Sequence, residues 1–161
     1  MTKYSYDDFG RVDKEHILLD KEIGTNNDRA LLLNYRARLK SAFENKFVQA
    51  EQLQKKAINL CDVAENPVLY ANLNMNMGVI YYDNNFPNKA LEYMEKAISA
   101  TEVSGIDTAN YYAMLKNYCD VIAASQDFGK AISPLEQNIE RAKAVNSIAY
   151  SDLLLIYPCC T

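Results

Sequence analysis

The sequence lacks the common motifs of enzyme active sites and is poor in histidine. It contains no tryptophan and a single histidine, His16, and its five glycines are scattered along the chain. No glycine-rich phosphate loop, Gly-x-Ser-x-Gly or His-Glu-x-x-His motif occurs. Catalysis usually needs an acid, base or nucleophile with an orienting partner, and we expect His16 to be an ordinary surface residue instead. The sequence therefore predicts a non-enzymatic protein.

The cysteines also lack the spacing that is typical of metal sites and of disulfide frameworks. Cys61 and Cys119 fall on helical faces that we expect to be core, and Cys159 and Cys160 are adjacent. Structural zinc needs four ligands, usually paired Cys or Cys and His at short spacings, and one histidine cannot complete such a set. We therefore expect no metal site, no cofactor and a reducing compartment.

Long runs of charge or of apolar residues are missing as well. The chain has 17 basic and 21 acidic residues, a net charge of −4, with no block of Lys and Arg. This balance argues against a nucleic-acid partner and against an electrostatic membrane anchor. The apolar run at 153–156 is far shorter than the roughly 18 residues that span a bilayer, and residues 1–8 do not resemble a secretory signal. We expect a soluble cytoplasmic protein that binds neither nucleic acid nor membrane.

What the sequence does contain is a helical repeat. Gly and Pro are too few for the many turns of an all-β fold, and the apolar residues recur at helical spacing, which predicts an all-α protein. Similar segments end at Ala50, Ala90 and Ala131, which are 40 and 41 residues apart. The same register aligns Asn34 with Asn74. A period of this length predicts stacked structural units.

The pattern within each period predicts a hairpin of two helices. We expect hairpins at about 28–65, 67–104 and 107–145, with breaks near Asn45, at 84–87 and at 126–127. Asn66 is expected to cap a helix that begins at Pro67. The sequence thus predicts an N-terminal segment, 1–27, with a short capping helix at 13–23, and a helical domain, 28–161. A truncated helix at about 147–157 would form half of a fourth repeat.

The middle repeat resembles the tetratricopeptide repeat (TPR). Its residues Met77-Gly78-x-x-Tyr81-Tyr82 and Ala90-x-x-x-Met94-x-x-Ala97 match the pattern Leu-Gly-x-x-Tyr … Ala-x-x-x-Phe-x-x-Ala. The resemblance covers about 28–157, is partial in the first and third repeats, and is similar to the longer TPRs of kinesin light chains and bacterial regulatory proteins. It implies an α-α superhelix, a solenoid, in which Gly78 and Ala90 lie where two helices cross.

The resemblance also implies a function: binding of a peptide or protein partner along a concave face formed by the first helix of each hairpin. In the first hairpin the ligand-facing positions are Leu32, Tyr35, Leu39, Ala42 and Phe43. We expect Leu32, Leu39 and Val79 to pack between neighbouring helices instead. The candidate binding residues are Tyr35, Asn72, Met75, Asn76, Tyr82, Lys116 and Asn117. Each of these could equally be a solvated surface residue.

The sequence is also compatible with other functions. The chain could be the peptide-sensing segment of a bacterial signalling or transcription regulator whose output domain is elsewhere, or an enzyme with an unrecognised site. At the C-terminal end, the expected truncated helix stops at Pro158, and the second helix of its hairpin does not follow. The apolar residues 154–157 would then have no helix to cover them. The chain could be a shortened piece, the short helix could fold back as a lid, or a second copy could dock there. We predict self-association through this end.

Overall fold

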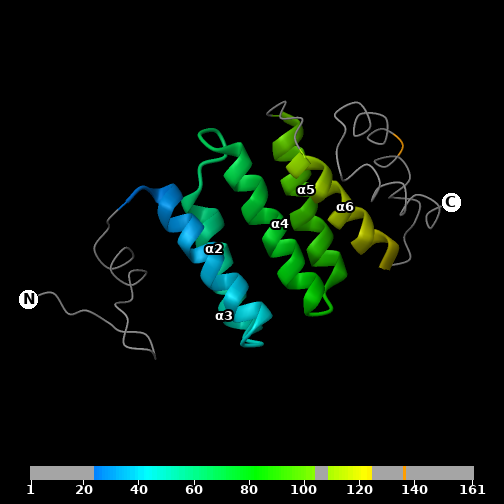
Figure 1. Cartoon of the computed structure of the whole chain (residues 1–161), viewed down its shortest axis with the longest axis horizontal. Helices are drawn as coiled ribbons and strands as arrows, with labels where there is room; N and C mark the ends of the chain where they lie inside the picture. The colour runs from blue at the N-terminus through cyan, green and yellow to red at the C-terminus, as the bar shows by residue number, and fades with distance from the viewer. Residues whose placement is uncertain (1–23, 104–108, 125–135, 137–161) are drawn as a thin grey trace, which may run out of the picture. The chain divides into compact units, whose positions relative to one another are not determined.

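The computed structural model describes residues 24–103, 109–124 and 136, and within those residues all regular secondary structure is helical. This confirms the predicted all-α class for the described part of the chain. The helices, labelled in Figure 1, are α2 (Asn26–Ala42), α3 (Phe47–Leu60), α4 (Pro67–Asp83), α5 (Pro87–Val103) and α6 (Ala109–Ala124). The helices expected at 13–23 and 147–157, the partner of α6 and the proposed self-association surface lie outside the described residues.

The described residues form two compact units, which divide between Cys61 and Asp62. In the first unit, α2 and α3 lie side by side as an antiparallel hairpin (Figure 1). Its core is built largely from small residues that let the two helices approach closely: Ala30, Leu33 and Ala37 of α2, and Ala50 and Ala57 of α3. The connecting turn contains Asn45 at a φ of 51°, a left-handed conformation that asparagine tolerates.

The first helix begins with a capping box. The Thr25 hydroxyl accepts a hydrogen bond from the Asp28 backbone N–H (3.2 Å), and the Asp28 carboxylate accepts one from the Thr25 N–H (2.8 Å). These reciprocal bonds satisfy backbone donors that a helix start otherwise leaves without partners. The bonds from the Thr25 backbone and hydroxyl also hold the pKa of Asp28 below its ordinary value.

We expect replacement of Thr25 by alanine to lower the free energy of unfolding by about 1 kcal/mol, because the Asp28 N–H loses its acceptor. Urea denaturation followed by far-UV circular dichroism measures this change. Thr25→Ser, which keeps the hydroxyl, is the control and should leave the stability nearly unchanged. Equal losses in the two variants would contradict a role for the hydroxyl in capping.

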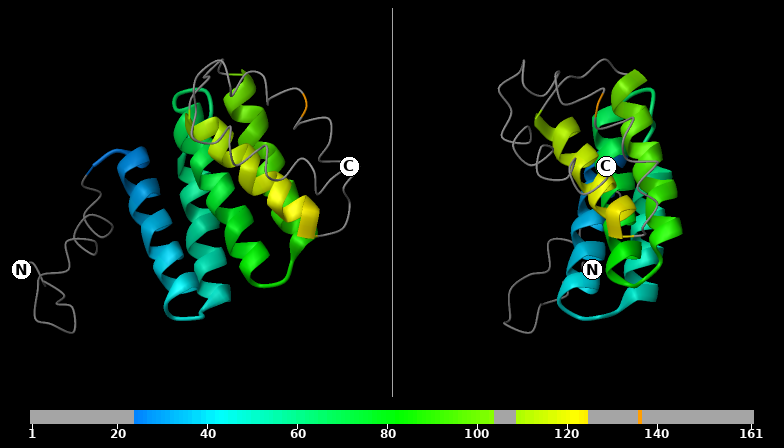
Figure 2. Two further views of the ribbon diagram at one scale, coloured as in Figure 1. Left: turned by 45° about the vertical axis from the view of Figure 1, so that its right-hand side comes forward. Right: turned by 90° about the vertical axis from the view of Figure 1, so that its right-hand side faces the viewer.

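The second unit contains α4, α5 and α6. As expected, Asn66 caps α4: its side chain accepts a hydrogen bond from the Leu69 N–H (3.0 Å), and Pro67 occupies the first helical position. Helices α4 and α5 run antiparallel and are joined by a turn with Asn85 at a φ of 63° (Figure 2). Helix α6 packs against α5. Cys119 of α6 is buried, and so is Cys61 of the first unit, as the sequence predicted.

Helices α4 and α5 come closest at Gly78. A Cβ at this position would lie 3.0 Å from the Ala90 carbonyl oxygen and 2.6 Å from the Met94 Cγ. The expected crossing of Gly78 and Ala90 is therefore confirmed. Tyr81, which is buried, stacks on Tyr93 beside this crossing, with ring centroids 5.5 Å apart. A larger residue at 78 would force the two backbones apart.

Two asparagines at equivalent repeat positions have different partners. Asn34 and Asn74 are both buried, with 6% and 1% of their surface exposed. The Asn34 Oδ1 accepts a hydrogen bond from the Gln54 Nε2 (3.0 Å), across the α2–α3 hairpin. The Asn74 Nδ2 donates to the Tyr70 carbonyl (2.8 Å), but its Oδ1 has no hydrogen-bond partner among the residues that the structure describes. Forty residues after Gln54 the chain has Met94, which offers no amide donor.

Candidate functional site

A row of exposed apolar side chains runs along α2 in the first unit. Leu31, Tyr35 and Leu39 are spaced four residues apart, which places them on one face of the helix, and Phe43 continues the row at its C-cap. Their exposed fractions are 39%, 56%, 52% and 82%, respectively. We call these four residues the α2 face. It contains Tyr35, a candidate from the sequence, together with three residues that were not among the predicted binding residues.

Leu39 corrects one expectation. The sequence suggested that it packs between helices, but about half of its surface is exposed. The reason is that α2 turns Ala30 and Ala37 toward α3, so a residue on the opposite side of α2 cannot reach that core. The four-residue spacing of Leu31, Tyr35 and Leu39 indicates an apolar face on this helix, but the spacing alone does not show that the face is open.

Basic residues flank the α2 face on both sides. Arg38 is exposed and follows Leu31 by two helical turns, which places it at one edge. Arg36 is half-buried and precedes Phe43 by two turns, which places it at the other edge. Lys40 instead binds Glu44, at 2.8 Å. The side-chain hydrogen bonds that Glu44 accepts, first from Lys40 and second from Lys46 in size of effect, hold the pKa of Glu44 below its ordinary value.

The candidates on α4 have mixed environments. Asn72 and Asn76 are half-buried, and Tyr82 is 39% exposed. Met75 is only 5% exposed, so the expectation that it offers surface to a ligand does not hold in this structure. The cause is that α4 has buried residues around most of its circumference, in contrast to the one-sided α2.

Tyr82 lies at a hollow in the second unit. It lines a space of about 530 Å³ together with Asn85, Pro87 and Ala124, from α4, the turn, α5 and α6. Burial raises the pKa of the adjacent Asp83.

The candidates on α6, Lys116 and Asn117, are both half-buried. The Lys116 ammonium forms an ion pair with the Asp120 carboxylate one turn later, at 2.6 Å. Tyr82 therefore borders a surface hollow, whereas Lys116 is ion-paired within its own helix.

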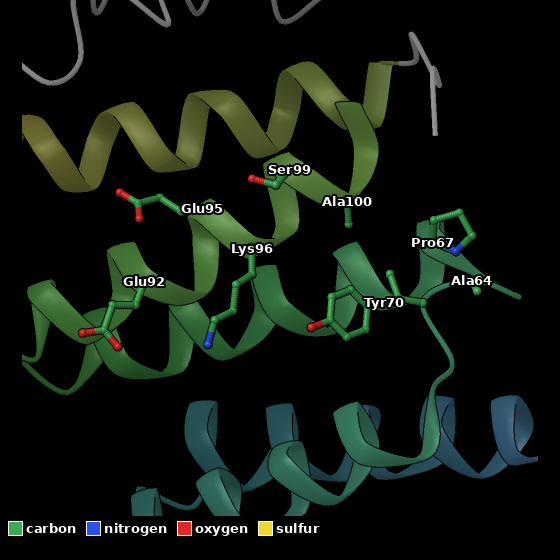
Figure 3. A pocket seen from close by; sticks show the side chains of 9 residues that line it. Ala64, Pro67, Tyr70, Glu92, Glu95, Lys96, Ser99 and Ala100 are labelled. Atoms are coloured by element: carbon green, nitrogen blue, oxygen red, sulfur yellow. The ribbon is translucent and has the colours of Figure 1, made fainter. Parts of the chain in front are cut away.

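A larger cavity, of about 730 Å³, lies elsewhere in the second unit. Figure 3 shows the side chains of Glu92, Glu95 and Lys96, which extend from α5 at the edge of this cavity (Figure 3). The Lys96 ammonium lies 4.6 Å from the centre of the Tyr93 ring, and Glu95 accepts a hydrogen bond from the Tyr118 hydroxyl, at 3.2 Å. The lining residues are Val63, Ala64, Pro67, Tyr70, Glu92, Glu95, Lys96, Ser99 and Ala100. Its mainly apolar walls could hold an apolar group, and no predicted site residue lines it.

In the part of the chain that the structure describes, no three His, Cys, Asp or Glu side chains gather in a way that could hold a metal ion. The described helices also include none with the length and hydropathy required to cross a membrane. A comparison with models of known protein families finds no match, and a search of curated protein sequences finds none either.

Proposed function

We propose that this protein is a non-enzymatic interaction module that binds a peptide or protein segment, and that the α2 face is part of its binding site. The supporting observation is the row of four large apolar side chains, each at least 39% exposed, on one helix. Single exposed apolar residues are ordinary on a protein surface, whereas a contiguous row of them is typical of a docking site.

The chemistry of the row favours protein binding. Burial of apolar surface contributes about 25 cal/mol per Å², and aromatic residues often dominate the affinity of an interface. Tyr35 and Phe43 supply such aromatic area, and Leu39 lies between them. Because Tyr35 and Phe43 are held on or at the end of a formed helix, a partner would meet preformed positions instead of ordering a loop.

We further propose that the hairpins are TPR-like and stack as a solenoid. The 40-residue period, the two-helix hairpins and the close contact at Gly78 support this arrangement. In such a stack the first helices of the hairpins would line one concave face. The remaining exposed or half-buried candidates would extend the site along that face: Asn72, Asn76, Tyr82, Lys116 and Asn117.

Replacing Leu39 with serine tests the binding site. Peptides selected on the wild-type protein from a random display library should bind Leu39→Ser about tenfold more weakly in fluorescence anisotropy, because the centre of the apolar row is lost. Thermal unfolding should change little, since Leu39 is half exposed. Val48→Ser is the matched control, because Val48 is a similarly exposed apolar residue on the other helix of the hairpin.

Two results would contradict the proposal. One is a library that yields no specific peptide for the wild-type protein. The other is equal weakening by Leu39→Ser and Val48→Ser, which would indicate that binding does not depend on the α2 face.

A further inference from the structure

The first hairpin differs in charge from the rest of the chain. Residues 24–61 contain seven Lys and Arg and three Asp and Glu, a formal charge of +4, whereas the whole chain carries −4. The remaining residues therefore sum to −8. Ion pairs such as Lys40–Glu44 and Lys55–Glu51 do not change this sum. A basic region in an acidic protein produces a local field that selects the charge of a binding partner.

The excess charge of α2 lies next to the apolar row. Arg38 is at one edge of the α2 face, and Arg36 is at the other. The one carboxylate of α2, Asp28, is in the first turn, where it is bonded to Thr25. A ligand on this face would therefore contact apolar side chains along its middle and the exposed Arg38 at one margin. Arginine is well suited to pair with carboxylates there.

The α2 face is better suited to a helical ligand than to an extended one, because a ligand must satisfy its backbone hydrogen-bonding groups. Of the four residues of the α2 face, only Tyr35 has a polar side-chain group, so the face provides few partners for the N–H and C=O groups of an extended segment. A helix satisfies its own backbone groups and can pack its side chains against the row. From Leu31 to Phe43 the row rises about 18 Å, which corresponds to roughly three helical turns.

We infer that the ligand of the α2 face is an acidic amphipathic helix of about three turns, with apolar residues against the row and Asp or Glu beside Arg38. This inference rests on the proposed function and specifies its partner. It also predicts salt sensitivity, because the exposed charge pairs at the margins are screened by ions.

Three designed peptides, each labelled and about 15 residues long, test the charge preference. They share leucines at helical spacing and differ in their flanking residues, which are Glu, Gln or Lys. Binding to the full chain is measured by fluorescence anisotropy. We expect the Glu peptide to bind about tenfold more tightly than the Lys peptide at about 50 mM salt, and the difference to shrink at about 300 mM.

Reversing the charge of Arg38 tests whether the preference for an acidic peptide depends on the α2 face. Arg38→Glu should weaken binding of the Glu peptide and strengthen binding of the Lys peptide. Lys56→Glu is the matched control, because it makes the same change in charge at an exposed residue of α3. Equal effects of the two reversals would show that only net charge matters, and would overturn the assignment to this face.

Equal binding of all three peptides, still reduced by Leu39→Ser, would overturn the acidic preference and leave the proposed function in place. No binding of any peptide, or no effect of Leu39→Ser, would count against both.

Other occupants of the α2 face are also outcomes of this test. Leu39-dependent binding to anionic phosphatidylglycerol vesicles, without peptide binding, would assign the face to a lipid surface. Leu39-dependent self-association in light scattering would assign it to a second copy. Binding of the Glu peptide only after Asp13, Glu15, Asp20 and Glu22 are changed to amides would assign it to the chain's own N-terminal segment. Each of these results would overturn the inference of a separate acidic partner.

Discussion

Replacing Gly78 with leucine is expected to lower the free energy of unfolding by about 3 kcal/mol, because the new side chain has no space at the crossing of α4 and α5. Even a Cβ would lie 2.6 Å from the Met94 Cγ and 3.0 Å from the Ala90 carbonyl oxygen. The methionine can move, but the carbonyl belongs to the backbone of α5. Relief of the overlap therefore requires the helices to separate, which loosens the core around Tyr81.

Urea denaturation followed by circular dichroism measures this loss, and Ala113→Leu is the control. Ala113 is an exposed residue of α6 in the same unit, so a leucine there should change the stability by less than about 0.5 kcal/mol. Gly78→Ala should fall between the two, because the gain in helix propensity offsets part of the overlap. Wild-type stability in Gly78→Leu would contradict the close crossing of α4 and α5.

Replacing Asn34 with leucine is expected to destabilise the protein by about 2 kcal/mol, whereas the same change at Asn74 should be neutral or stabilising. The side chains are similar in size, so the difference reflects hydrogen bonding. Asn34 accepts the bond from Gln54, and its loss removes an acceptor from a buried amide. The Oδ1 of Asn74 is buried without a partner in the described part of the chain, so removal of the side chain relieves a desolvation cost.

The two variants are compared by urea denaturation, with native-state hydrogen exchange to locate the change in the first or the second unit. Met94→Gln is an additional variant, since it introduces an amide at the position equivalent to Gln54 and should stabilise the second unit if it reaches the Asn74 Oδ1. Equal destabilisation by Asn34→Leu and Asn74→Leu would show that hydrogen bonding does not distinguish the two positions.

The binding surface could be predicted only in part. The position of Tyr35 in the repeat indicated an exposed residue on α2, which the structure shows. The repeat position also placed Met75 on the surface, whereas Leu39 was expected to pack between helices instead of facing a ligand, and both expectations were wrong. Apolar residues at helical spacing mark a face of a helix, but the pattern is the same whether that face is covered by another helix or left open.

By itself, the sequence determined the helical class, the 40-residue period and the cap at Asn66. These features depend on interactions between residues near each other in the chain, and residue types and spacing indicate them. The close contact at Gly78 was implied by the resemblance to the TPR, and the structure shows it. The tertiary structure alone decided which faces are covered. It pairs Asn34 with Gln54, leaves the Asn74 Oδ1 without a partner among the described residues, and keeps the α2 face open, because burial depends on which neighbour packs against each helix.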